Sequence, residues 1–116
     1  MTIEIYHNPR CSKSRQALQL LQDRGIEPTI IAYLDTPPDA DELQAVLKKL
    51  GMTADEIMRT GEEAYKAQKA EVARMSDAEK LQWLSENPKV IQRPIVISGD
   101  DARVGRPPES ILEILS

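Results

Sequence analysis

The chain has little of what disulfides, metal centres and aromatic cores require. Cys11 is the single cysteine among 116 residues, so no disulfide can form within the chain. His7 is the single histidine, which leaves no cluster of Cys and His to hold a zinc ion. Phenylalanine is absent and there are four aromatic residues in all, so the core must consist of Leu, Ile, Val and Ala. Disulfide chemistry at Cys11 would therefore need a second sulfur from another molecule.

Further absences limit where the protein works. No apolar run approaches the about 20 residues that cross a bilayer, and the first residues lack the charged and apolar segments of a secretion signal. A net charge of −4 argues against broad nucleic-acid binding, and the five glycines fit neither the dinucleotide nor the P-loop fingerprint. We therefore expect residues 1–116 to form one soluble, cytoplasmic domain without metal, bound cofactor, nucleic acid or membrane.

The order of predicted elements indicates an α/β fold. Residues 2–6 alternate in polarity and predict a strand, and residues 12–24 carry an apolar stripe at helical spacing. Residues 29–33 form a β-branched apolar run, typical of a strand buried in a sheet. This βαβ opening implies parallel strands. A hairpin over 94–104 and a helix from about Pro107 complete the chain.

A helical insert separates these two halves and covers about residues 34–90. The S/T-x-x-E capping pattern at Thr53 and at Ser76 predicts helices near 54–59 and 77–86. Without the insert, a βαβ unit joined to a ββα unit remains. That combination predicts a thioredoxin-like fold with a helical insert between the second and third strands.

The segment around Cys11 is the candidate site. Residues 7–15 contain three permanent positive charges and no carboxylate, and they lead from a strand into a helix. Free N–H groups and the helix dipole favour an anion there, and the same features lower the pKa of a thiol, whose thiolate is the nucleophile. His7 is a candidate to donate a hydrogen bond to the thiolate or, when protonated, to favour it. The alternatives are a buried inert thiol and a histidine that only closes the strand.

Several motifs follow one another in a recognisable order. They are His7-Asn8-Pro9-x-Cys11-x-x-Ser14-Arg15, Glu27-Pro28-Thr29-Ile30, Tyr33-Leu34-Asp35-Thr36-Pro37-Pro38, Arg93-Pro94-Ile95-Val96 and Arg106-Pro107. Together they resemble the motifs of the glutaredoxin-coupled arsenate reductases, the ArsC family. The resemblance runs from Ile3 to Leu115, and it implies a thioredoxin-like fold in which Pro94 is a cis proline beside the cysteine.

The resemblance implies arsenate reduction. The residues that it assigns to the site are Cys11, His7 and Ser14 as catalytic groups and Arg59, Arg93 and Arg106 as arsenate ligands. Planar guanidinium groups suit that role because they pair with two oxyanion oxygens at once. Cys11 would form a thiol-arsenate adduct, glutathione would act as co-substrate and reduce it, and glutaredoxin would resolve the mixed disulfide. The implied partners are thus arsenate, glutathione and glutaredoxin.

Two departures from the family pattern leave other functions open. Ser12-Lys13 after Cys11 and Val104-Gly105 before Arg106 differ from the best characterised arsenate enzymes. A glutathione-dependent thiol oxidoreductase with another substrate is one alternative. A Spx-like regulator that binds RNA polymerase is another, although Ser14 stands where the disulfide switch of such regulators has its second cysteine.

Overall fold

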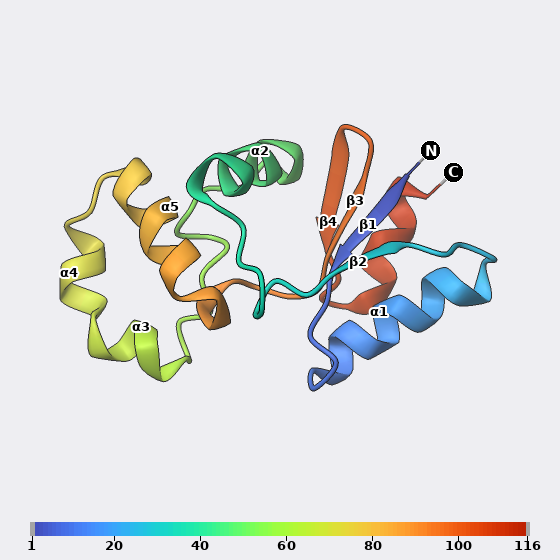
Figure 1. Ribbon diagram of the computed structural model, residues 1–116, viewed down its shortest axis with the longest axis horizontal. Coiled ribbons are helices and arrows are strands. Elements are labelled where there is room, and N and C mark those ends of the chain that lie inside the picture. Colours follow the sequence, from blue (N-terminus) through green and yellow to red (C-terminus); the bar gives the residue numbers. More distant parts are fainter. Residues whose placement is uncertain (1, 116) are drawn as a thin grey trace. The chain divides into compact units, whose positions relative to one another are not determined.

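The computed structural model describes residues 2–115 and divides them into two compact units (Figure 1). The first unit contains residues 2–36 and 93–115 and holds the β-sheet. The second unit, Pro37–Gln92, is helical. No helix within residues 2–115 is long and apolar enough to cross a membrane.

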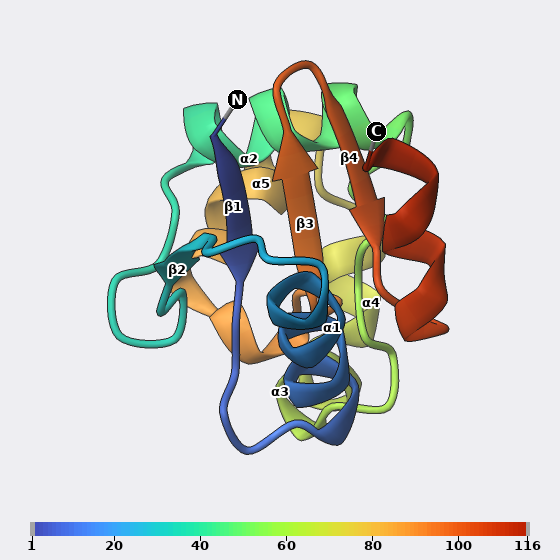
Figure 2. The same cartoon turned by 90° about the vertical axis from the view of Figure 1, so that its right-hand side faces the viewer.

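The sheet of the first unit has four strands in the order β2-β1-β3-β4 (Figure 2). Their bounds are Ile3–Tyr6 for β1, Thr29–Ile31 for β2, Ile95–Ser98 for β3 and Asp101–Val104 for β4. β1 pairs in parallel with β2 and antiparallel with β3, and β3 pairs antiparallel with β4. The parallel pair and the hairpin are the two halves that the sequence predicts, so the thioredoxin-like arrangement is confirmed.

Helix α1, Ser12–Asp23, connects β1 to β2 and contacts the C-terminal 3₁₀ helix η2, Pro108–Ile114. The core cluster that joins these elements to the sheet is wholly inaccessible to solvent and consists of Ile5, Ala17, Leu21, Val96 and Ile111. This cluster is aliphatic, as expected from the absence of phenylalanine, but the expectation of a purely aliphatic core is wrong, because Tyr6 and Tyr33 are also buried in this unit, at 4% and 0% exposed. It anchors α1, and therefore the residue at its start, against the central strands.

Two predictions for the first unit need correction. The strand expected to be buried, β2, is an edge strand, and Ile30 on it is 51% exposed. An apolar β-branched run cannot by itself distinguish a central strand from an edge strand, because the position in the sheet depends on long-range pairing. The last helix is 3₁₀ and begins at Pro108. Its closely spaced apolar residues are compatible with either helix type, since both place every third or fourth residue on one face.

In the second unit, five short helices follow one another. They are α2 Ala40–Leu50, α3 Glu63–Ala67, α4 Lys69–Ala73, α5 Asp77–Glu86 and the 3₁₀ helix η1 Pro88–Val90. α2 packs against α5, whose predicted capping box is formed by Ser76 and Glu79. Such reciprocal bonds satisfy N–H groups that the first helical turn leaves without intrahelical acceptors.

The helix predicted near 54–59 does not form. Thr53 and Glu56 do exchange the two bonds of a capping box, at 2.9 and 3.2 Å. Beyond this turn, however, the backbone pairs with a distant segment: the Gln92 N–H donates to the Ile57 carbonyl at 2.8 Å, and the Arg59 N–H donates to the Val90 carbonyl at 2.6 Å. These tertiary bonds replace the i to i−4 bonds that a helix would need.

Candidate active site at the start of helix α1

Cys11 is the N-cap residue of α1 and has extended backbone angles, with φ −94° and ψ 122°. The loop from β1 folds back on itself here, because the Cys11 N–H donates to the Asn8 carbonyl at 3.0 Å. The Cys11 carbonyl accepts the first intrahelical bond, from the Arg15 N–H at 3.0 Å. The half-buried thiol therefore lies beside the free N–H groups of the first helical turn.

Two arginines that flank the C-terminal hairpin, one before β3 and one after β4, reach this thiol. Arg106 donates from Nη2 to the Cys11 sulfur over 3.6 Å and from Nε to the Arg93 carbonyl over 2.8 Å. The Arg93 side chain also donates a hydrogen bond to the sulfur. The strand register explains this convergence.

Ile95 at the start of β3 lies opposite Val104 at the end of β4, and also opposite Tyr6 at the end of β1. Arg93 lies two residues before Ile95, and Arg106 lies two residues after Val104, so both lie beyond this pair at the same end of the hairpin. The ends of three strands thus meet at one edge of the sheet, and the loop that follows β1 carries Cys11 to the same edge.

The pKa of the Cys11 thiol results from opposing effects. Burial, the largest single influence, raises the pKa because it disfavours the charged form. It is outweighed by hydrogen bonds from the Ser14 amide, the Arg93 side chain and the Lys13 amide, together with the charge of Arg93. The net pKa lies below the usual value for cysteine. Cys11 therefore has an increased thiolate fraction near neutral pH, as a nucleophile requires.

His7 and Ser14 form a buried pair behind the loop. His7 Nδ1 lies 2.6 Å from Ser14 Oγ, and the same oxygen accepts the Asn8 N–H at 3.0 Å. Ser14 is completely inaccessible to solvent and His7 is 9% exposed. One hydroxyl therefore joins the end of β1, the loop and the first turn of α1, and it holds the Ser14 amide toward the sulfur.

The geometry around His7 differs from the expected contact with the thiolate. The ring nitrogen Nδ1 is directed at Ser14, because the serine side chain points from the first turn of α1 into the loop. Burial, and secondarily the charge of Arg15, lower the pKa of His7 below its usual value. A neutral imidazole at neutral pH cannot favour the thiolate by its charge, so the structure supports a positional role for this residue.

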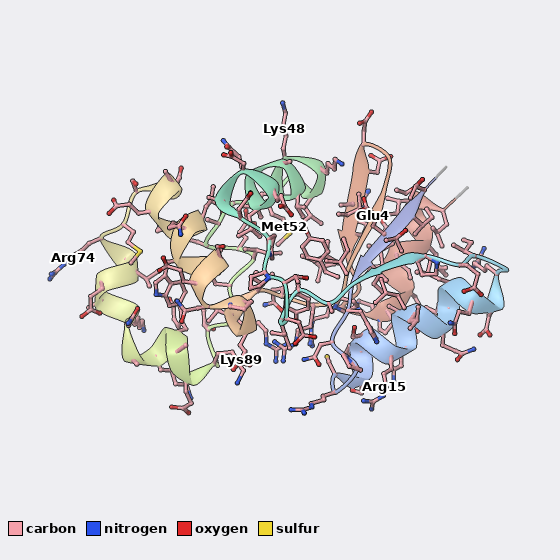
Figure 3. All side chains as sticks on the ribbon, viewed as in Figure 1. Glu4, Arg15, Lys48, Met52, Arg74 and Lys89 are labelled. Carbon is pink, nitrogen blue, oxygen red and sulfur yellow. The ribbon has the colours of Figure 1, made fainter. Side chains whose placement is uncertain are left out.

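Arg15 makes a contact that the sequence analysis missed. This residue lies at the start of α1 (Figure 3), and its Nη1 donates to the Pro9 carbonyl at 2.8 Å. Arg10 contributes its backbone N–H to the Asn8 side-chain oxygen at 3.0 Å. The loop before Cys11 is therefore held from both sides. From the sequence alone, an arginine side chain such as that of Arg15 is expected to be a solvated surface charge. Only the folded structure shows that it donates a hydrogen bond to the Pro9 carbonyl.

Arg59 belongs to the second unit. Its Nε lies 3.5 Å from Glu62 Oε1, and both side chains are about one-quarter exposed, at 26% and 28%. Its backbone is anchored to Val90, as described above. The assignment of Arg59 as an anion ligand stays a prediction from the family resemblance.

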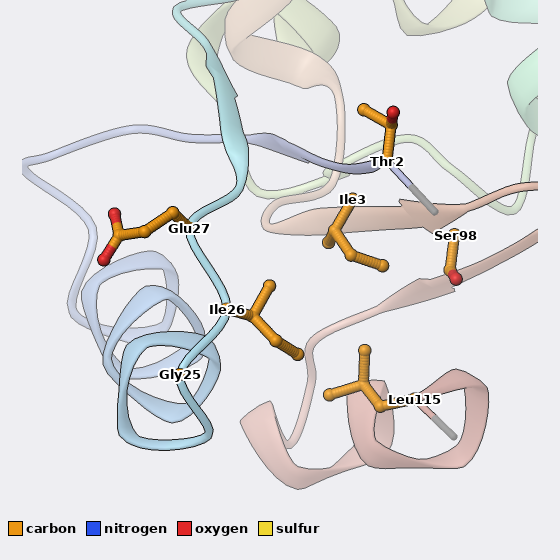
Figure 4. A pocket seen from close by; sticks show the side chains of 7 residues that line it. All are labelled: Thr2, Ile3, Gly25, Ile26, Glu27, Ser98 and Leu115. Atoms are coloured by element: carbon orange, nitrogen blue, oxygen red, sulfur yellow. The ribbon is translucent and has the colours of Figure 1, made fainter.

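A hollow of about 510 Å³ lies elsewhere in the first unit (Figure 4). Its lining residues are Thr2, Ile3, Gly25, Ile26, Glu27, Ser98 and Leu115. Gly25 follows the C-terminal end of α1, whereas Cys11 precedes the N-terminal end, and a helix of this length separates them by about 18 Å. None of the residues at the thiol lines the hollow, so it is separate from the candidate active site.

Comparison with known proteins places these features in a family context. The model of the ArsC family matches residues 6–114. A Haemophilus influenzae protein named arsenate reductase is 48% identical over 116 residues, which cover 99% of this chain and 100% of the relative. An Escherichia coli K12 protein named Uncharacterized protein YfgD is 48% identical over 114 residues, 97% of this chain and 96% of the relative. A solved structure titled arsenate reductase from Vibrio cholerae superposes with a TM-score of 0.94 at 46% identity and covers 99% of this chain and 98% of that one.

Proposed function

Because this chain belongs to the ArsC family, we propose that it is an arsenate reductase whose nucleophile is Cys11. The observation that carries the proposal is the contact of two arginine side chains with one thiol of lowered pKa. Arginines that stabilise a thiolate are also placed to bind an oxyanion next to it. Relatives and solved structures that match nearly the whole chain are named arsenate reductases, which supports the same substrate here.

Arsenate would bind where these donors converge. Arg93 and Arg106 each use one part of the guanidinium group at the sulfur, and both groups have further N–H donors for arsenate oxygens. We include Arg59 as a third ligand on the basis of the family pattern. The positive charges offset the repulsion between a thiolate and an anion, so that the sulfur can approach the arsenic atom.

The first chemical step forms a covalent adduct. The Cys11 thiolate donates its electron pair to arsenic and forms an S–As bond, and one arsenate oxygen leaves as water after it takes up protons from solvent. Arsenic keeps the oxidation state As(V) in this step. His7 and Ser14 hold the loop and the Ser14 amide in place, so the negative sulfur stays oriented before the attack.

The second step is the reduction, and it uses thiols from outside the chain. The thiolate of glutathione attacks the Cys11 sulfur, and the S–As bond breaks with its electron pair on arsenic. Arsenite, As(III), leaves, and Cys11 remains as a mixed disulfide with glutathione. A glutaredoxin thiolate then attacks the glutathione sulfur and releases the Cys11 thiolate. This route needs no second cysteine in the chain, in accord with the cysteine count, and it suits the cytoplasm, where glutathione keeps thiols reduced.

The test is a coupled assay with purified protein, glutathione, glutaredoxin, glutathione reductase and NADPH. We expect NADPH consumption that requires arsenate and is lost in Cys11→Ser. Omission of glutaredoxin should leave adduct formation intact but stop turnover. Circular dichroism of Cys11→Ser provides the control for folding.

Absence of turnover in a folded protein whose Cys11 is readily alkylated at neutral pH would contradict the arsenate assignment. The site would then serve other thiol chemistry, and a glutathione mixed-disulfide substrate in the same coupled assay would detect it. Arsenate turnover that persists without glutaredoxin would contradict only the proposed reductant.

A further inference from the structure

Gly105 lies at a very close backbone approach beside the active site. The residue is buried, and in the sequence it follows the last residue of β4 and precedes Arg106. A β-carbon built at this position would lie 2.7 Å from Pro94 Cγ and 3.4 Å from both Pro94 Cδ and Ile111 Cγ2. The Gly105 N–H also donates to the Pro94 carbonyl at 2.8 Å. The proline ring is rigid, so a side chain at position 105 would have to push the two segments apart.

This close approach determines where the next side chain begins. Arg106 follows directly, and its N–H donates to the Val104 carbonyl at 2.9 Å, which tightens the turn after β4. From there the guanidinium reaches the Arg93 carbonyl over 2.8 Å and the Cys11 sulfur over 3.6 Å. All these contacts lie within the first unit. A displacement of Gly105 from Pro94 therefore moves the start of the Arg106 side chain away from both acceptors.

We propose that Gly105 is a positioning residue that sets the approach of the Arg106 guanidinium to the Cys11 sulfur and to an oxyanion bound beside it. Its contribution is the absence of a side chain, which allows the chain after β4 to contact Pro94 directly. The approach of Arg106 to the bound oxyanion rests on the proposed arsenate reductase activity. The approach of Arg106 to the Cys11 sulfur does not depend on that activity.

The experiment compares Gly105→Ala with Gly61→Ala. Gly61 is exposed, and a β-carbon there meets no atom within 4 Å, so this variant reports the general effect of replacing glycine by alanine. The rate of Cys11 alkylation by iodoacetamide is measured as a function of pH. We expect Gly105→Ala to slow alkylation at neutral pH by roughly threefold to tenfold and to move the midpoint of the profile to higher pH, because a displaced cation stabilises the thiolate less. Gly61→Ala should match the unmodified chain.

A double-mutant cycle shows whether the effect passes through Arg106. If it does, Gly105→Ala causes little further change in a chain that already carries Arg106→Gln. Equal slowing in both backgrounds would overturn the proposal, because the glycine would then act on the fold in general. An unchanged alkylation profile in Arg106→Gln alone would also overturn it, as would a Gly105→Ala chain that fails to fold.

Arsenate kinetics separate this inference from the proposed function. With active protein, Gly105→Ala should raise the KM for arsenate more than it lowers kcat, since ligand placement is disturbed more than the nucleophile. Suppose that Gly105→Ala shifts the alkylation profile but the unmodified protein does not turn over arsenate. This result would refute the proposed function and support the role of Gly105 in positioning Arg106 at the thiol. Arsenate turnover by the unmodified protein, together with an unshifted alkylation profile in Gly105→Ala, would support the proposed function and refute the positioning role of Gly105.

Discussion

Replacement of Ser14 by alanine should destabilise the first unit far more than its small change in volume suggests. The Ser14 hydroxyl is fully buried and has two partners, His7 Nδ1 at 2.6 Å and the Asn8 N–H at 3.0 Å. Alanine removes both hydrogen bonds and leaves two polar groups in a region that water does not reach. Each lost bond is worth about 1 kcal/mol, and an unsatisfied buried partner adds to that cost, so we expect a loss of about 2–4 kcal/mol in the free energy of unfolding.

Urea unfolding followed by circular dichroism measures this loss, and Ser12→Ala is the matched control. Ser12 lies two residues earlier on the same helical turn and is exposed, so its substitution should change the free energy by no more than about 0.5 kcal/mol. Cys11 alkylation should also slow in Ser14→Ala, because the loop that carries the thiol loses its anchor. Similar unfolding energies for the two variants would refute the argument that this hydroxyl holds the loop.

Two further predictions concern the charges at the site. His7 has a lowered pKa in the folded protein, so the unfolded chain takes up the imidazole proton first as the pH falls. The free energy of unfolding should therefore decline as the pH falls below about 6.5 toward the folded pKa. Urea unfolding of His7→Gln should lack this part of the decline. An identical pH dependence in both chains would contradict this assignment. Arg93→Lys keeps the charge but loses the planar fork, so the KM for arsenate in the coupled assay should rise at least about tenfold. A KM that stays within about twofold would show that Arg93 does not bind the anion through paired contacts.

Much of the fold follows from local patterns in the sequence. The alternation in residues 2–6, the apolar stripe of α1 and the capping box at Ser76 each predict an element that forms. These signals are read correctly because the interactions behind them involve residues only two to four positions apart. The pattern at Thr53 shows the limit of such reasoning, since both bonds of the box form but the backbone beyond it pairs with residues 90–92.

For the candidate active site, the sequence by itself determined the proposed nucleophile, Cys11, and its local environment. A lone cysteine at the junction of a strand and a helix lies beside free amides for purely local reasons, and the Lys13 and Ser14 amides do lower its pKa. Motif resemblance named Arg93 and Arg106. It did not show that either side chain would reach the sulfur.

Only the tertiary structure decided those contacts. The register of β1, β3 and β4 brings Arg106 to a cysteine 95 residues away, and the packing of α1 against the end of β1 places the Ser14 hydroxyl at His7 Nδ1. The close approach of Gly105 to Pro94 likewise exists only once the hairpin is packed. The physical reason is the same in each case: strand pairing and burial set these distances, and both depend on residues that are far apart in the chain.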